Sequence, residues 1–278
     1  MKKIAQGKVI IAGAGPGDAE LITLKAARAL QRADVVLTDR LVSEEILHEH
    51  VSPLAKIIFV GKEGCNNAQS VSQKEINQML IDEASQGKLV VRLKGGDVAF
   101  FSNVLDELYT LVEHEIHYEI IPGITAASGA SAYSGIPLTA RNHARSVRFV
   151  TYSHNKFSEN YWNELATTED TLVFYMSGEN WYDLAEQFIQ HNISNNKKIA
   201  IVQQATTTYQ KVFVHDFDEL KRSKPEHDFV SPSLIIVGKV VNLHEEFSWK
   251  ENSKVDENYF RPATRKHIEV INENKLSA

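Results

Sequence analysis

The sequence predicts an α/β protein with two lobes, the first built on a mostly parallel sheet and the second on a mixed sheet. Up to residue 121, short β-rich runs alternate with helix-like patterns, which is typical of a parallel sheet covered by helices. A segment rich in Gly, Ala, Ser and Thr interrupts this alternation between residues 122 and 145. Beyond it the strand-like runs lie closer together, which favours antiparallel pairing in the second lobe.

The first lobe begins as a βαβ unit and continues in the same rhythm. Its strand-like runs cover residues 8–12, 34–37, 57–60, 89–93 and 118–121. Its predicted helices cover residues 18–33, a segment that opens at the capping box Ser72-x-x-Glu75, and residues 103–114.

The second lobe has strand-like runs at residues 147–152, 171–176, 198–203, 211–215 and 234–241, and one strong helix over 181–191. We therefore predict an N-terminal lobe (1–122), an interlobe linker and substrate segment (123–146), a C-terminal lobe (147–244) and a polar extension (245–278). The extension has no clear apolar period, so a docked helix near 265–274 and a solvated tail both stay open.

Composition limits the function classes. The 278 residues are 43% apolar and carry a net charge of −6, which is typical of a globular protein. An acidic balance argues against a broad phosphate-binding surface, so we expect no nucleic-acid partner. No apolar run approaches the ~20 residues of a membrane span, and we expect no membrane partner. One cysteine, Cys65, and no zinc-like spacing predict a cytoplasmic protein without a metal.

The first glycine turn, residues 13–18, follows the first strand at the position of a dinucleotide-binding fingerprint. Its details differ from that fingerprint. Asp18 stands where the third glycine is needed, and Pro16 removes a backbone donor that a pyrophosphate would use. These differences argue against a nicotinamide dehydrogenase. Asp18 and one glycine fit a simple strand-to-helix turn, whereas three glycines around a proline favour close approach of a ligand.

Two further glycine turns follow predicted parallel strands, at Gly95-Gly96-Asp97 and at residues 122–129. The carboxyl ends of parallel strands meet at one edge of a sheet, where ligands bind in open α/β folds. Asp97 is suited either to accept a hydrogen bond from an amine or hydroxyl of a ligand or to cap the next helix. Together the three turns predict a pocket for a flat or extended small molecule.

Over about residues 8–243 the chain resembles the tetrapyrrole methylases, most closely the uroporphyrinogen-III C-methyltransferases. The motifs that carry the resemblance are GAGPGDAELITLKAARALQRADVVLTDRLV (13–42), VVRLKGGD (90–97), IPGITAASGASAYSGIPLTAR (121–141), LVFYM (172–176) and SPSLIIVGKVV (231–241). Each motif alone is weak, and their shared order gives the resemblance its weight.

The resemblance implies a two-lobed methylase fold, a homodimer, S-adenosylmethionine as methyl donor, and a tetrapyrrole as substrate. In the family, two methyl groups pass to ring carbons of uroporphyrinogen III and give precorrin-2, a precursor of sirohaem and cobalamin. Asp39 and Arg141 are expected to face the tetrapyrrole as catalytic residues. The residues expected to bind the donor are Pro16, Gly95, Gly96, Asp97, Phe100, Thr125, Ala126, Met176, Ala205, Ser233 and Leu234.

The chain departs from the family where substrate is expected to bind. The family run PFxFGRGGEE reads VAFFSNVLDE over residues 98–107, so that Asn103 replaces an arginine and Val104 and Leu105 replace two glycines. The family motif PLTHR reads PLTAR, with Ala140 in place of histidine. These changes leave two alternatives open: a methyltransferase with another acceptor, and a catalytically impaired binding homologue.

The acceptor expected from the resemblance carries eight carboxylates, which calls for a basic wall. The candidates are Arg40, Lys62, Lys94, Arg141, Arg145 and Arg148, with Arg145 and Arg148 able to compensate for the missing arginine.

Overall fold

The computed structural model describes residues 7–61, 71–152, 157–177, 180–225, 230–255, 257–260 and 270–271. Lys62 and Cys65 lie outside these ranges. The chain divides into two compact units, Met1–Thr125 with Phe260–Ala278 (unit 1) and Ala126–Tyr259 (unit 2). The division therefore falls inside the segment 123–146, and the described residues 260 and 270–271 group with unit 1.

Unit 1 contains a six-stranded sheet in the order β11-β3-β2-β4-β1-β5. Its strands are β1 (Lys8–Gly13), β2 (Val35–Thr38), β3 (Lys56–Phe59), β4 (Leu89–Lys94), β5 (His117–Ile121) and β11 (Val270–Ile271). Strands β1 to β5 are parallel and β11 is antiparallel to β3. The predicted mostly parallel sheet is confirmed, whereas a helix through residues 265–274 is wrong at 270–271, which form a strand.

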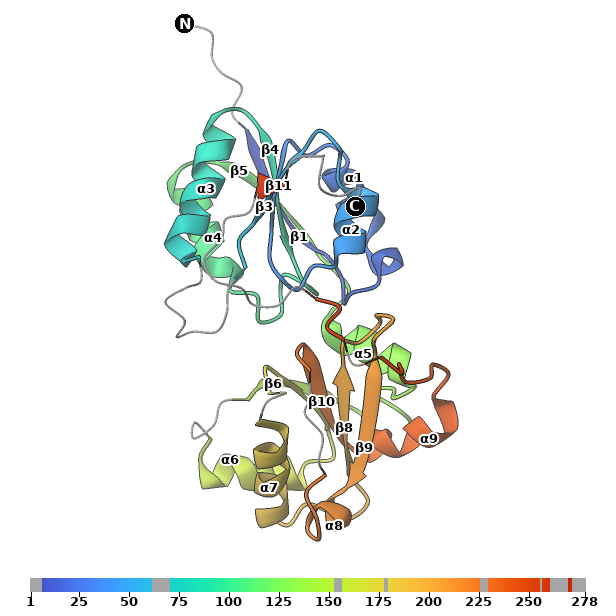
Figure 1. Ribbon diagram of the computed structural model, residues 1–278. Helices are drawn as coiled ribbons and strands as arrows, with labels where there is room; N and C mark the ends of the chain where they lie inside the picture. Colours follow the sequence, from blue (N-terminus) through green and yellow to red (C-terminus); the bar gives the residue numbers. More distant parts are fainter. Residues whose placement is uncertain are drawn as a thin grey trace, which may run out of the picture. The chain divides into compact units, whose positions relative to one another are not determined.

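Helices cover both faces of this sheet (Figure 1). Helices α1 (Leu24–Leu30) and α2 (Glu44–His50) pack on one face, and α3 (Gln73–Ser85) and α4 (Val104–Glu113) pack on the other. The capping box of α3 is confirmed, because the Ser72 hydroxyl accepts from the Glu75 amide at 3.2 Å and the Glu75 carboxylate accepts from the Ser72 amide at 2.7 Å.

The first helix is shorter than the predicted 18–33, because two caps divide the segment. Asp18 accepts a hydrogen bond from the Glu20 amide at 2.9 Å and opens a short 3₁₀ turn. Thr23 then accepts from the Ala26 amide at 3.2 Å and starts α1. Side chains that bind nearby amides favour such local starts over a continuous helix.

Unit 2 contains a five-stranded mixed sheet in the order β6-β7-β10-β8-β9. Its strands are β6 (Val147–Thr151), β7 (Thr171–Tyr175), β8 (Lys198–Gln203), β9 (Lys211–Asp216) and β10 (Ser233–Gly238). Only the β6–β7 pair is parallel among these neighbours. The predicted mixed sheet is confirmed. Strand β10 ends three residues earlier than the predicted 241, where a 3₁₀ turn (Lys239–Leu243) follows Gly238.

Helices α6 (Glu159–Thr167), α7 (Trp181–Gln190) and α8 (Phe217–Leu220) pack on one face of this sheet, and α5 (Ala126–Ser134) packs on the other. A last short helix, α9 (His244–Phe247), follows β10. The expectation of one strong helix between the later strands is wrong, because α6 also lies between β6 and β7. Ser158 caps α6, and the helix buries Trp162 and Leu165 within a mostly polar sequence, which weakens its apolar period.

Among the described residues, no helix is long and apolar enough to cross a membrane.

Candidate functional site

The three glycine turns meet at the carboxyl edge of the unit 1 sheet. Gly15 and Gly96 exchange two backbone hydrogen bonds of 3.1 and 2.7 Å. A Cβ atom on Gly123 would lie 2.3 Å from the Gly96 carbonyl oxygen, and one on Gly13 would lie 2.6 Å from the same oxygen. Such distances leave no room for a side chain, so the backbones can meet only because these residues are glycines. We call this contact the glycine junction.

Asp97 ties the second turn to the third. One carboxylate oxygen accepts from the Ala99 amide at 2.7 Å and the other accepts from the Gly123 amide at 2.8 Å. The residue is only 7% exposed. Asp97 therefore caps its own segment through Ala99 and also holds the backbone of the junction through Gly123. Thr125 lies within the third turn, and Phe100, three residues after Asp97, is 42% exposed.

Asp39 lies directly after β2, beside the second turn. Its carboxylate accepts from the Leu41 amide at 3.0 Å, and its other oxygen lies 4.0 Å from the Arg92 guanidinium. A Cβ atom on Gly95 would come within 2.8 Å of the Leu41 carbonyl oxygen. The structure thus brings Asp39 and the Gly95 turn together within unit 1.

A buried ionic cluster lies beneath Asp39. Arg92 and Lys94 project from β4 toward Glu107 of α4, at 3.0 Å from Arg92 Nε and 3.1 Å from Lys94 Nζ. Arg92 also donates to the Leu37 and Leu93 carbonyls. Burial raises the pKa of the Glu107 carboxyl, but the two cations outweigh that effect and the pKa lies below its ordinary value. Burial and the Arg92 charge lower the pKa of Lys94, against the attraction of Glu107.

This cluster corrects the expected basic wall, because Lys94 is 5% exposed and bound to Glu107. Sequence reasoning also missed Arg92 and Glu107 as members of the site. Two cations at alternate positions of an otherwise apolar strand lie on one face. This spacing in the sequence could have predicted a buried acidic partner, because buried cations need an opposite charge.

In unit 2, the structure gathers three of the expected donor-binding residues. Ala126, Ala205 and Leu234 belong to one apolar cluster on the α5 face of the sheet. Met176 follows β7 directly and is 65% exposed, with a left-handed φ of 57°. Ser233 begins β10 and pairs with Gln203 of β8.

The Gln203–Ser233 pair carries two buried polar atoms that lack a hydrogen-bond partner among the described residues. They are the Gln203 amide nitrogen Nε2 and the Ser233 hydroxyl oxygen. Directly opposed residues of antiparallel strands project from the same face, so both atoms lie on one side of the sheet. Ile201 and Ile235, two residues away on the same strands, pack on the α6–α8 face. The two polar atoms therefore lie on the face opposite to the cluster of Ala126, Ala205 and Leu234.

The three arginines from the expected basic wall in this unit differ in their surroundings. The Arg148 guanidinium donates hydrogen bonds to the carboxylates of Glu164 and Asp170. The bond to Glu164, followed by the bond to Asp170, raises the pKa of the guanidinium. Arg148 therefore already binds two carboxylates of its own unit. Arg141 and Arg145 are exposed and form no ion pair within the described part of the chain. Of the two arginines expected to compensate for the missing one, Arg145 is the one without an ion pair among the described residues.

Asn103 occupies a left-handed conformation (φ 52°) at the start of α4 and makes no side-chain cap. Asparagine tolerates this conformation better than most residues with a longer side chain. Asn103, at the position where the family has an arginine, is exposed, and its side chain does not cap α4.

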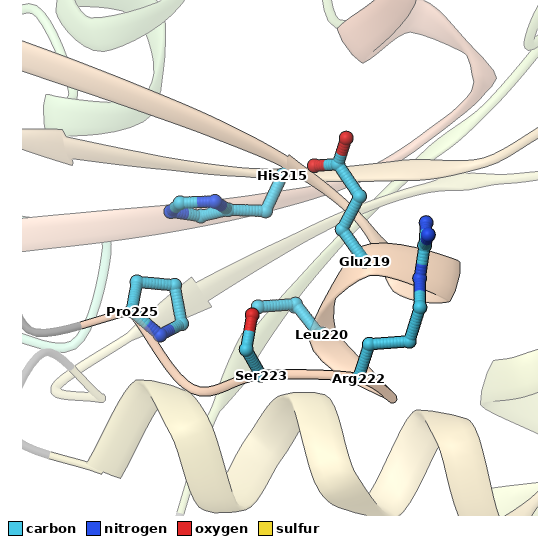
Figure 2. A pocket seen from close by; sticks show the side chains of 6 residues that line it. All are labelled: His215, Glu219, Leu220, Arg222, Ser223 and Pro225. Atoms are coloured by element: carbon cyan, nitrogen blue, oxygen red, sulfur yellow. The ribbon is translucent and has the colours of Figure 1, made fainter.

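A separate cavity of about 350 Å³ lies in unit 2 between β9 and the segment after α8 (Figure 2). It is lined by His215, Glu219, Leu220, Arg222, Ser223 and Pro225. None of the expected site residues borders it, so it is not the candidate site. No group of three or more His, Cys, Asp or Glu side chains is placed to hold a metal in the ranges that the structure describes.

A two-unit α/β protein with a glycine junction at the edge of its parallel sheet is the class that fold and site define. Residues 8–221 match the family described as Tetrapyrrole (Corrin/Porphyrin) Methylases. The chain belongs to this family, as the ordered motifs predicted.

Relatives of known name agree with this membership. Siroheme synthase 2 of Yersinia enterocolitica is 46% identical over 244 residues, which are 88% of this chain and 51% of that protein. The chain spans about half the length of the curated relatives it matches. The structure of uroporphyrin III C-methyl transferase from Thermus thermophilus is 33% identical, with a TM-score of 0.70 over 85% of this chain and 100% of that chain. Its complex with S-adenosylhomocysteine, also 33% identical with the same coverage, gives a TM-score of 0.69.

We predict that Glu107→Gln lowers the free energy of unfolding by about 3–5 kcal/mol, because it removes the carboxylate that binds both buried cations and leaves only the more distant Asp39, 4.0 Å from Arg92. Urea denaturation measures the change. Glu113→Gln, on an exposed position of the same helix, is the matched control and should leave stability nearly unchanged. Equal stability of the two variants would contradict the role given to the cluster.

We predict that Gly123→Ala lowers the free energy of unfolding by about 1–3 kcal/mol, because its Cβ would overlap the Gly96 carbonyl oxygen. Gly61→Ala is the control, since its Cβ would lie 3.7 Å from the nearest atom. Thermal and urea unfolding of both variants test this. A Gly123→Ala protein as stable as the control would show that the junction is looser than described.

Proposed function

We propose that the protein transfers methyl groups from S-adenosylmethionine to ring carbons of uroporphyrinogen III and forms precorrin-2, for sirohaem or cobalamin biosynthesis. The glycine junction is the observation that supports this most directly, because it brings the ends of three parallel strands, where ligands bind in α/β folds, together beside Asp39. The Thermus thermophilus relative, crystallised with S-adenosylhomocysteine, supports the choice of donor.

The expected donor-binding residues come from both units: Pro16, Gly95, Gly96, Asp97, Phe100 and Thr125 from unit 1, and Ala126, Met176, Ala205, Ser233 and Leu234 from unit 2. The donor supplies an electrophilic methyl group, so this chain needs no nucleophilic side chain. Its task is to hold that methyl about 3–3.5 Å from the acceptor carbon and in line with it.

Asp39 is proposed to stabilise the positive charge that grows on the pyrrole ring as its carbon attacks, before a base removes the ring proton. Arg92, 4.0 Å from the Asp39 carboxylate, keeps that carboxylate beside a fixed positive charge. Arg141, exposed on the loop closed by the Ala140–Ala144 backbone bridge, is proposed to bind a substrate carboxylate through its planar fork.

We also propose a homodimer in the cytoplasm, as the family resemblance implies. Helix α4 supports the dimer, because Leu105, Tyr109 and Val112 are 60–71% exposed and their spacing places them on one helix face. Exposed apolar patches commonly mark interaction sites. Light scattering should give twice the chain mass, and a monomer at all concentrations would overturn the proposed dimer.

For the location, cell fractionation should recover the protein in the cytoplasmic fraction.

The deciding experiment is anaerobic incubation of the protein with S-adenosylmethionine and freshly generated uroporphyrinogen III. The mass of the tetrapyrrole should increase by two methyl groups, and two molecules of S-adenosylhomocysteine should be released for each tetrapyrrole. Donor binding in calorimetry without methyl transfer would instead support a different acceptor or an impaired binding homologue.

Asn103 favours a second candidate, methylation of a different tetrapyrrole. Its side chain is shorter than the arginine of the family and carries no charge. Phe101 and Asn103 both have left-handed backbone conformations. An altered wall at this position would change which ring substituents are accepted.

We predict that Asn103→Arg raises kcat/KM for uroporphyrinogen III about tenfold, the equivalent of about 1.4 kcal/mol in the barrier, because it restores a cation for a carboxylate. Asn103→Ala is the control, since alanine meets the same left-handed backbone without adding charge. Steady-state kinetics of both variants measure the effect. No gain over Asn103→Ala would favour the second candidate.

A further inference from the structure

The segment after α9 is bound to the outer edge of the unit 2 sheet. We call residues 249–255 and 257–259 the strap; they lie beyond the 8–221 family match and run beside the edge strand β9 (Figure 1). The Asn252 side chain accepts from the Val212 amide at 2.7 Å and donates to the Val212 carbonyl at 3.0 Å. The Ser253 amide donates to the Gln210 carbonyl at 2.9 Å. The strap therefore binds both peptide groups of Val212, near the start of β9, and the carbonyl of Gln210 just before the strand.

A second attachment of the same kind joins the strap to Gln204. The Gln204 side chain donates to the Glu257 carbonyl at 2.8 Å and accepts from the Tyr259 amide at 2.6 Å. Gln204 is 3% exposed, so these bonds are shielded from water. An amide side chain that binds both a peptide N–H and a peptide C=O fixes position and orientation together.

Between these attachments lies the turn of residues 204–210, which carries Ala205. Gln204 and Thr206 flank Ala205 with φ of 45° and 72°, in the left-handed region that a β-branched residue rarely adopts. Such conformations persist only where the surroundings fix them. Inside the turn, the Gln210 side chain accepts from the Thr206 amide at 2.7 Å. The Gln204 amide donates to the Pro232 carbonyl at 2.8 Å, next to Ser233.

We propose that the strap is a positioning element for methyl-donor binding, in which Asn252 and Gln204 hold the 204–210 turn in the strained shape that presents Ala205. This inference rests on the proposed function, which assigns Ala205 to the donor. A turn that is already ordered before the ligand arrives loses less conformational entropy on binding. Neither Asn252 nor Gln204 needs to touch the donor, so their effect is on donor affinity.

The test is Asn252→Ala in the full-length chain, which removes both bonds to Val212 and changes no expected donor contact. We expect the Kd for S-adenosylmethionine in calorimetry to rise about tenfold, equivalent to about 1.4 kcal/mol. At saturating donor, kcat and the KM for the tetrapyrrole should stay unchanged. Amide hydrogen exchange at residues 204–210 should accelerate. A purely structural role would lower the active fraction and leave the Kd of the folded protein unchanged.

Glu251→Ala, an exposed neighbour on the strap, is the matched control and should bind the donor like the wild type. Asn252→Asp keeps the acceptor for the Val212 amide and should give an intermediate Kd, which also serves if the alanine variant folds poorly. Wild-type protein that binds the donor, with an Asn252→Ala Kd within twofold of the control, would overturn the strap proposal alone. Wild-type protein that binds no donor would overturn the proposed function and this inference with it.

Discussion

The close backbone contact at the glycine junction is the constraint on which the unit 1 site depends. Peptide groups after β1, β4 and β5 can meet only if the residues at the contact have no Cβ. The parallel register brings these three strand ends to the same edge. Asp97 then fixes the contact by accepting from two amides. The edge thus becomes a surface of ordered backbone, and the side chains around it are free to determine which ligand binds.

A second constraint is electrostatic. Arg92 and Lys94 lie in an otherwise apolar strand, and their burial is tolerated because Glu107 and Asp39 supply opposite charge. Removing charges from water is costly unless they are paired with good geometry. This cluster also joins the packing of α4 to the position of Asp39. The residue expected to face the substrate is therefore fixed by the same contacts that anchor a helix.

The parallel and mixed sheets and the family were predictable, because strand alternation and glycine turns are local patterns. The α3 capping box was readable for the same reason. Helix α6 was missed because only Trp162 and its few apolar neighbours mark the buried face. The division of the first helix depends on two competing side-chain caps, and periodicity does not register that competition. Of the site, the glycine turns were predictable, whereas the partners of Lys94 and Gln204 come from distant segments and depend on tertiary structure.

The strap also affects how readily the sheet edge of unit 2 can pair with other protein molecules. Strand β9 is the last strand of its sheet, and an open edge of this kind can pair with strands from other molecules. The Val212 peptide groups that Asn252 binds are those that face away from β8. A side-chain amide here takes the place of a further strand without continuing the hydrogen-bond ladder. The segment that orders the turn therefore also blunts an edge at which aggregation would begin.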